Sequence, residues 1–226
     1  RDGPRASPSL RGINSEGDSG GEYERLGIEP TPDDGERLRP EMPWDESTRP
    51  RRPESGPEVT YSERGREVGK HLIDVHDHLR AELRELRSLI EQVRDGHRGA
   101  GEVRGELNRM AMRQNDWTLG AFCSRYCVAV AGHHNLEDVS VFPHLRRAEP
   151  ALEEVIDRLA DEHLAIGDAL AAVDRALVTH INNPGDFEPL QITVDALTDA
   201  LLSHLSYEER ELVEPLARVG FMPGQV

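Results

Sequence analysis

The chain has 226 residues, of which 36% are hydrophobic and 31% are charged, and its formal net charge is −16. This length suits one domain with an additional tail, and such an acidic surface makes nucleic acid and anionic membranes poor partners. No apolar run reaches the roughly 18 residues of a membrane span, and we expect no signal peptide. The two cysteines, Cys123 and Cys127, lie on one expected helix. The sequence therefore lacks a secreted disulfide framework and predicts a cytoplasmic protein.

Residues 1–60 differ in composition from the rest of the chain. They hold nine of the 15 prolines and eight of the 20 glycines, with few aliphatic residues. Because such a segment buries too little apolar surface to offset its ordering entropy, we expect a disordered, acidic, Pro/Gly-rich arm. Two short apolar stretches within it, at 23–28 and 42–44, could dock on the domain, and the arm is also a candidate site for a protein partner.

Beyond this arm the spacing of apolar residues indicates helices and no strands. The first helix is expected to begin near Thr60 or Ser62, where a capping-box pattern occurs, and to end at 95–96. A short helical stretch at 102–112 is expected to follow. The second long helix is expected to open at 115–116, where two capping residues stand together.

The second helix is expected to end near Pro143 and the third to open at 149–150, with a proline in the tolerated first turn. A loop at 182–186 separates the third helix from the fourth. Apolar residues recur every three or four positions on all four long helices, so their apolar faces can meet along one axis. We therefore predict an all-α, antiparallel up-down four-helix bundle over residues 61–220, with a short C-terminal tail at 221–226.

The apolar face of each long helix also carries one histidine, and two of these histidines have a glutamate one turn later. A single histidine on such a face usually forms a hydrogen bond in the core, but four, one from each helix, would converge on the bundle axis. Glutamate is almost never fully buried unless it is paired or coordinates a cation, and no lysine or arginine interrupts these faces. The sequence therefore predicts a metal centre with six ligands: His76, His133, Glu137, His163, His204 and Glu208.

Imidazole and carboxylate ligands suit iron, zinc and manganese, whereas the absence of thiolate argues against a closed structural zinc site. Iron is the first candidate, with two ions that Glu137 and Glu208 could bridge and with the histidines as terminal ligands. The adjacent residues His134, Asp138 and Glu209 are candidates for holding these ligands in place. For Asp138 and Glu209 the alternatives are a solvated position or, if a helix is rotated, a direct role as ligand.

Four strings surround the expected ligands: His76-Asp77-His78-Leu79, His133-His134-Asn135-Leu136-Glu137-Asp138 running into Val141-Phe142-Pro143, Glu162-His163, and His204-Leu205-Ser206-Tyr207-Glu208-Glu209. On these strings the chain resembles the hemerythrin-like (HHE cation-binding) family over residues 67–218. It is also similar to actinobacterial proteins of this type around residues 113–118. The resemblance implies an antiparallel four-helix bundle with a non-haem di-iron centre, in which two iron ions per chain share an oxo or carboxylate bridge.

The oxygen-carrying members of this family differ from the chain at two places. They have a second histidine one turn after the third-helix ligand, where this chain has Gly167, and a His-x4-Asp pair where it has His204 and Glu208. Because glycine offers no ligand, we expect one iron to keep an open position, which favours reaction with small molecules over oxygen carriage alone. Tyr126 is either a core aromatic residue or an iron ligand that fills this position.

These expectations favour a di-iron protein that binds or reacts with a small oxidant, namely dioxygen, peroxide or nitric oxide. As an enzyme it would be a di-iron oxidoreductase that decomposes peroxide, although the sequence shows no clear proton relay. As a binding module it would sense iron or oxygen, with the N-terminal arm as its output. In a third alternative the protein is a helical scaffold whose histidines only form hydrogen bonds, which would leave its buried glutamates without partners.

Overall fold

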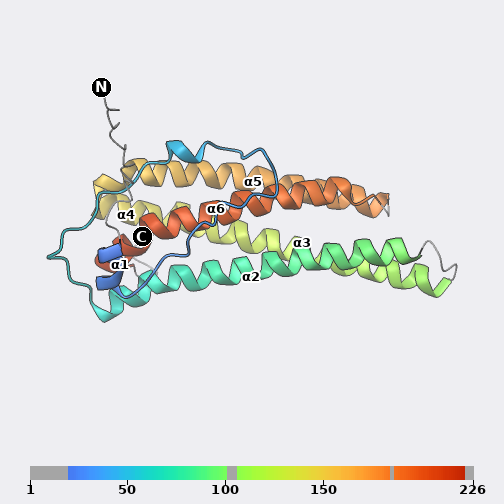
Figure 1. The fold of residues 1–226 in the computed structure, drawn as a ribbon, viewed down its shortest axis with the longest axis horizontal. Coiled ribbons are helices and arrows are strands. Elements are labelled where there is room, and N and C mark those ends of the chain that lie inside the picture. Colours follow the sequence, from blue (N-terminus) through green and yellow to red (C-terminus); the bar gives the residue numbers. More distant parts are fainter. Residues whose placement is uncertain (1–19, 101–105, 184–185, 222–226) are drawn as a thin grey trace, which may run out of the picture.

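The computed structural model describes residues 20–100, 106–183 and 186–221, without the side chains of residues 20 and 96–117. Every regular element in these ranges is helical. Consecutive long helices lie side by side and run in opposite directions (Figure 1). The four long helices are α2 (Glu63–Ala100), α3 (Glu106–Leu136), α5 (Glu153–Asn182) and α6 (Glu188–Val219). The predicted all-α class is confirmed, and none of the described helices is both long and apolar enough to cross a membrane.

The helices extend further than their sequence signals predicted. Helix α2 continues past the expected stop at Gly96 to Ala100, and α3 contains the expected start at 115–116 within one continuous helix. A single glycine costs a helix only about 1 kcal/mol, which the packing of a long amphipathic face can offset. Pro143 does not end the helical path either, because it lies in the first turn of α4 (Phe142–Ala148), where its missing N–H is tolerated.

Two short irregular turns adjust the path of the chain around α4. One turn of π-helix, η2 (Glu137–Val141), joins α3 to α4, and a 3-10 turn, η3 (Pro150–Leu152), precedes α5. A π-helical turn inserts an extra residue into the helical path and often occurs at functional sites. Its first residue here is Glu137, which is buried and is one of the predicted ligands.

Two apolar clusters fill the bundle, and the predicted ligands lie between them. One cluster contains Leu72, Leu159 and Leu212, and the other contains Leu79, Ile166 and Leu205. On each of these helices the sequence therefore passes from one cluster, through a polar position, into the other cluster. His76 on α2, His163 on α5 and Glu208 on α6 occupy that polar layer, and all three are buried.

Helices α2 and α6 approach each other closely at the start of α2. A Cβ atom on Gly65 would lie 2.0 Å from the carbonyl oxygen of Ala217, and one on Gly69 would lie 2.8 Å from the carbonyl oxygen of Val213. Both positions therefore need glycine. This contact holds the first half of α2, which carries His76, against the helix that carries Glu208.

Residues 20–60, part of the segment whose composition predicted a disordered arm, lie along the bundle; we call them the strap. The strap contains α1 (Gly20–Leu26) and a 3-10 turn, η1 (Glu46–Thr48). It follows α6 toward the middle of the bundle, turns, and returns past α5 to the start of α2 (Figure 1). Its outward part reaches Arg210, Glu209 and Asp199, and its returning part reaches Ser203, Tyr207, Glu211 and Glu214. Residues 1–19 of the expected arm lie outside the described residues.

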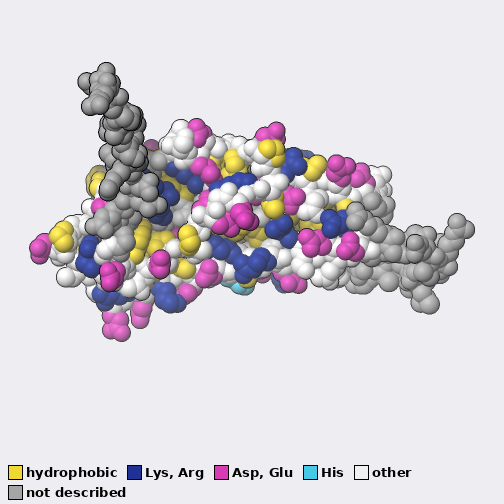
Figure 2. All heavy atoms as spheres, in the orientation of Figure 1, with side chains coloured by type: hydrophobic (Ala, Val, Ile, Leu, Met, Phe, Trp, Pro, Cys, Tyr) yellow, Lys and Arg dark blue, Asp and Glu magenta, His cyan; other side chains and the backbone are white. Residues whose placement is uncertain are grey.

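Hydrogen bonds between polar groups tie the strap to the bundle, and the apolar content of residues 20–60 gives no measure of these bonds. The backbone N–H groups of Leu38 and Arg39 donate to the two carboxylate oxygens of Asp199, at 2.9 and 2.7 Å. The two apolar stretches also dock, since Leu26 is fully buried and Trp44 packs against an apolar cluster. Figure 2 shows basic and acidic side chains next to one another on this face of the molecule.

Candidate metal centre

The structure brings the six predicted ligands together and adds a seventh residue. Their ligand atoms form two groups, within each of which all atoms lie within 4.8 Å of one another. The first group consists of His76, His133, Glu137 and Glu208, and the second consists of His134, His163 and His204. Both groups draw on α3 and α6, and α2 and α5 contribute one residue each.

The additional residue, His134, is the main difference from the sequence prediction. The buried positions of α3 include Cys123, Tyr126 and Val130 and continue to His134, whereas the side chain of His133 remains 10% exposed at the edge of this face. Spacings of both three and four residues fit a helix, so Val130 can be followed by either histidine. Both enter the site, with ring centroids 5.6 Å apart.

In the first group, His76 is central. Its Nε2 atom lies 3.0 Å from Nε2 of His133 and 3.5 Å from Oε2 of Glu208. His133 Nε2 is also 3.2 Å from Oε1 of Glu137. Two imidazole nitrogens and two carboxylates therefore face one small volume.

The two glutamates connect the groups. Glu137 presents Oε1 to His133 and Oε2 to His163, at 3.2 and 3.6 Å. Glu208 presents Oε2 to His76 and to His204, at 3.5 Å in each case. Each carboxylate thus lies between histidines of both groups, which is the position a bridging ligand would need.

Several ligand atoms are buried without a hydrogen-bond partner. They are Nε2 of His134, His163 and His204, Oε2 of Glu137, and both carboxylate oxygens of Glu208. An unsatisfied buried polar atom is costly, and an unpaired buried carboxylate is more so. Because these atoms all point into one site, and because imidazole and carboxylate are good ligands for divalent transition metals, the site fits a pair of such ions.

Burial keeps the histidines of α3 neutral. It lowers the pKa of His133 to about 3 and also lowers the pKa of His134. Burial raises the pKa of Glu137 well above its usual value, and the charge of Glu208 raises it further. Neutral imidazole is the form that binds metal, and a bound cation would compensate two carboxylates held this close together.

Carboxylates outside the two groups orient three of the histidines. The Nδ1 atom of His76 lies 3.0 Å from Oε1 of Glu209, and Nδ1 of His163 lies 2.8 Å from Oδ1 of Asp138. These two contacts give Glu209 and Asp138 the supporting position, and Glu209 is fully buried. Such contacts fix the ring and leave Nε2 facing the centre.

The third orienting carboxylate, Glu162, had no assigned role in the sequence prediction. Its Oε2 atom lies 3.0 Å from Nδ1 of His204. Burial raises its pKa, but hydrogen bonds from His204 and from Arg49 outweigh burial and lower the pKa to about 2. The sequence offered one signal for this role, because Glu162 directly precedes the candidate ligand His163. The histidine that it orients, however, is His204 on another helix.

Two other residues considered from the sequence do not lie among these ligand groups. The hydroxyl of Tyr126 donates to the carbonyl oxygen of Leu79 at 3.2 Å, within an apolar cluster, so Tyr126 is a core residue. Gly167 is exposed, and a Cβ atom there would have no neighbour within 4 Å. The expected gap at Gly167 is therefore not part of the buried site, and the second group is completed by His134 instead.

A cavity of about 450 Å³ reaches the first group from the surface between α2 and η2. Its lining includes His133 and Glu137 of the first group, together with Arg64, Glu67 and His71. The remaining lining residues are all apolar: Val68, Leu72, Val75, Leu136, Val141, Leu216 and Phe221.

A comparison with profiles of known protein families gives a match. The profile of the hemerythrin HHE cation binding domain matches residues 70–216, which is most of the chain and includes all seven candidate ligands. A search of curated proteins and a search of solved structures gave no match. With this profile match and a buried site of histidines and glutamates within the matched region, the chain belongs to the hemerythrin HHE cation-binding domain family.

Proposed function

We propose that the protein binds two iron ions per chain and that these ions bind or react with a small oxidant such as dioxygen, peroxide or nitric oxide. One observation carries the proposal: nitrogen and oxygen ligand atoms from separate helices converge in a buried layer without hydrogen-bond partners. Desolvating these atoms would cost stability in a plain helical scaffold, and a pair of bound cations would offset that cost.

The two groups suggest how the ions would be shared. His76 and His133 would hold one ion, and His134, His163 and His204 would hold the other, with Glu137 and Glu208 between them. A site without thiolate, made of imidazole and carboxylate, suits iron. Cys123 packs in an apolar cluster and does not join the ligands.

Bound iron would supply redox chemistry and exchangeable coordination positions, which protein side chains do not provide. The residues of the chain would perform the remaining tasks. Glu162, Glu209 and Asp138 orient three histidines, and burial keeps His133 and His134 neutral. The apolar clusters on either side of the layer shield it from solvent along the bundle axis.

The apolar cavity supports access of a small molecule to the ions. It offers a path between α2 and η2 that ends at His133 and Glu137. An apolar lining suits neutral molecules such as dioxygen and nitric oxide, since a charged species would lose its hydration there. The cavity therefore favours a reactive centre over a metal that is purely structural.

A second candidate is an iron or oxygen sensor that does not turn over a substrate. The strap favours it, because this segment contacts two of the carboxylates that orient ligands, Glu162 and Glu209. A peroxide-decomposing oxidoreductase and a sensor would differ in turnover. Steady release of oxygen from added peroxide, lost in His133→Ala, would identify the enzyme.

The first experiment is elemental mass spectrometry of the protein purified with iron supplied and without a histidine tag. We expect about two iron ions per chain, followed by a change in absorption when the reduced protein meets dioxygen, peroxide or nitric oxide. No iron, or a single zinc ion, would contradict the di-iron proposal. Full iron content without a spectral response to any of the three molecules would contradict the reactive role and leave cation binding.

A further inference from the structure

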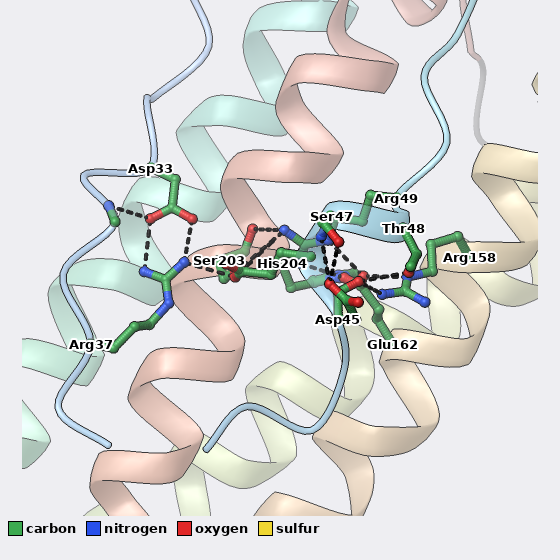
Figure 3. A network of polar contacts seen from close by, with 12 residues as sticks. Asp33, Arg37, Asp45, Ser47, Thr48, Arg49, Arg158, Glu162, Ser203 and His204 are labelled. Atoms are coloured by element: carbon green, nitrogen blue, oxygen red, sulfur yellow. Dashed lines mark hydrogen bonds and ion pairs between the residues drawn. The ribbon is translucent and has the colours of Figure 1, made fainter. Parts of the chain in front are cut away.

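Given the proposed metal centre, we propose that the strap is a working part of it, and that Arg49 is a positioning residue that holds His204 through Glu162. The strap precedes the region that matches the family profile, which begins at residue 70. Its contribution therefore comes from outside the domain that supplies the ligands. The contact network of Arg49, Glu162 and His204 is drawn in Figure 3.

Arg49 donates two parallel hydrogen bonds to the carboxylate of Glu162. Its Nε atom donates to Oε1 at 2.8 Å, and its Nη2 atom donates to Oε2 at 2.9 Å. The second of these oxygens also accepts from Nδ1 of His204 at 3.0 Å. A rotation of Glu162 would therefore break the contact with His204 and the contact with Arg49 together.

The guanidinium of Arg49 is itself held on its other sides. It lies over the rings of Trp44 and Tyr207, 5.4 and 4.6 Å from their centroids, and its Nη1 atom donates to Oγ of Ser203 at 2.9 Å. Its side chain is only 7% exposed. A flat fork with five donors can make these contacts at once, whereas a lysine ammonium cannot.

A second link joins the strap to the other metal group. The backbone N–H of Thr31 donates to Oε2 of Glu209 at 2.7 Å. The other oxygen of Glu209 accepts from Arg80 at 2.6 Å and lies 3.0 Å from Nδ1 of His76. The strap thus reaches one orienting carboxylate in each group, through two different kinds of donor.

The third orienting carboxylate provides an internal comparison. Asp138 holds His163 without any described contact to the strap, and its side chain is 42% exposed. Without the strap, Glu162 would lose its contacts with Arg49 and keep only Arg158 as a basic partner, and Glu209 would lose the N–H of Thr31 and keep Arg80. We therefore expect loss of strap contacts to weaken the hold on His204 and His76 and to leave His163 in place.

The first test compares Arg49→Gln with Arg51→Gln, because Arg51 lies in the same strap but is exposed. Loss of a residue that supports a ligand typically weakens metal affinity by about 10–100-fold. We expect a loss of this size for Fe²⁺ in the Arg49 variant, measured by competition with a chelator, and none in the Arg51 variant. Arg49→Lys should also bind Fe²⁺ more weakly, because lysine keeps the positive charge but cannot form the two parallel hydrogen bonds to Glu162. Equal affinities in the wild-type protein and the Arg49→Gln variant would overturn the proposal.

A second readout needs no metal. In the metal-free protein, the Nδ1 hydrogen of His204 should exchange slowly with solvent in nitrogen-edited NMR spectra, and exchange should be faster in Arg49→Gln but not in Arg51→Gln. This readout separates the two proposals. If the wild-type protein binds no metal, the proposed function fails, while the exchange rates still decide whether Arg49 positions His204.

The Thr31 contact offers an independent pair of variants if Arg49→Gln does not fold. Thr31→Pro removes the N–H that donates to Glu209, whereas Thr31→Ala keeps it. We expect weaker Fe²⁺ binding in the proline variant alone. Identical binding in the two variants would show that the strap only covers α6 and does not support the site.

Discussion

The Nε2 atoms of His76 and His133 lie 3.0 Å apart, so one of the two nitrogens carries a hydrogen in this arrangement. His76 already faces Glu209 through Nδ1, at 3.0 Å. A neutral His76 that donates to Glu209 leaves its Nε2 as an acceptor, so the hydrogen between the rings belongs to His133. Binding of a metal to both nitrogens requires that hydrogen to leave Nε2 of His133, and the ring stays neutral when its Nδ1 atom carries the hydrogen instead, so metal uptake is coupled to a change of tautomer at His133.

Removal of the His133 ring should therefore empty the first group and spare the second. We expect His133→Ala to lower the iron content from about two ions to about one ion per chain, because His134, His163 and His204 remain. The matched control is His78→Ala, since the side chain of His78 is 72% exposed on the neighbouring helix. Elemental analysis measures both. Unchanged iron content in the His133 variant would contradict its role as a ligand.

The close contact of α2 and α6 predicts opposite effects for two glycine-to-alanine changes within helices. In Gly65→Ala, the new methyl group would meet the carbonyl oxygen of Ala217, and we expect a loss of about 1–3 kcal/mol in the free energy of unfolding. In Gly132→Ala the methyl group meets nothing within 4 Å, and the higher helix propensity of alanine should stabilise by about 0.5–1 kcal/mol. Urea denaturation measures both. A neutral Gly65→Ala would mean that the helices can separate at little cost.

The bundle itself was predictable because hydrophobic periodicity follows directly from helix geometry. The ends of the helices were less predictable, because Gly96 and Pro143 are weak local signals that long-range packing can override. The turn of π-helix at Glu137 has no signature in the spacing of apolar residues. The extra residue in this turn rotates the following residues about the helix axis, whereas a spacing of three or four residues assumes an uninterrupted α-helix.

The convergence of the six candidate ligands was predictable because each is polar on an otherwise apolar face, whereas their role as metal ligands stays a prediction. His134 was assigned a supporting role because it follows a stronger candidate, and the spacing rule selected only one of the two. The strap could not be predicted in this way. Its docking depends on buried carboxylates such as Asp199 and Glu162. The sequence does not distinguish these carboxylates from exposed ones, because their partners Leu38, Arg39 and Arg49 are brought to them only by the fold.

Acid should weaken docking of the strap through Glu22. Burial raises the pKa of Glu22, but hydrogen bonds from Arg52 and from the N–H of Ser55 outweigh burial and leave it below the usual value. A pKa lowered in the folded state gives stability that is present above the unfolded value of about 4.3 and is lost as pH falls through the folded value. We expect fluorescence of Trp44, with Trp117→Phe removing the other tryptophan, to report undocking below about pH 4.

The matched pair for this pH dependence is Glu22→Gln and Glu24→Gln. Glu24 is exposed, so its loss should leave the acid transition unchanged. Glu22→Gln should weaken docking at neutral pH and flatten the transition, because the group that gains a proton is absent. An acid transition of the same size in both variants would assign the effect to other carboxylates.

The cavity predicts that reaction with an oxidant can be slowed without disturbing the metal. Leu136 lines the cavity, whereas Val139 does not, although the two side chains are similarly exposed, at 53% and 54%. In Leu136→Trp the larger side chain would fill part of the path to His133, whereas Val139→Trp changes a residue that does not line the cavity. Stopped-flow mixing of the iron-loaded protein with dioxygen should then show a slower reaction in Leu136→Trp and a wild-type rate in Val139→Trp, at equal iron content. Equal rates in both variants would mean that the oxidant reaches the ions by another route, and the cavity would lose its role as the entrance.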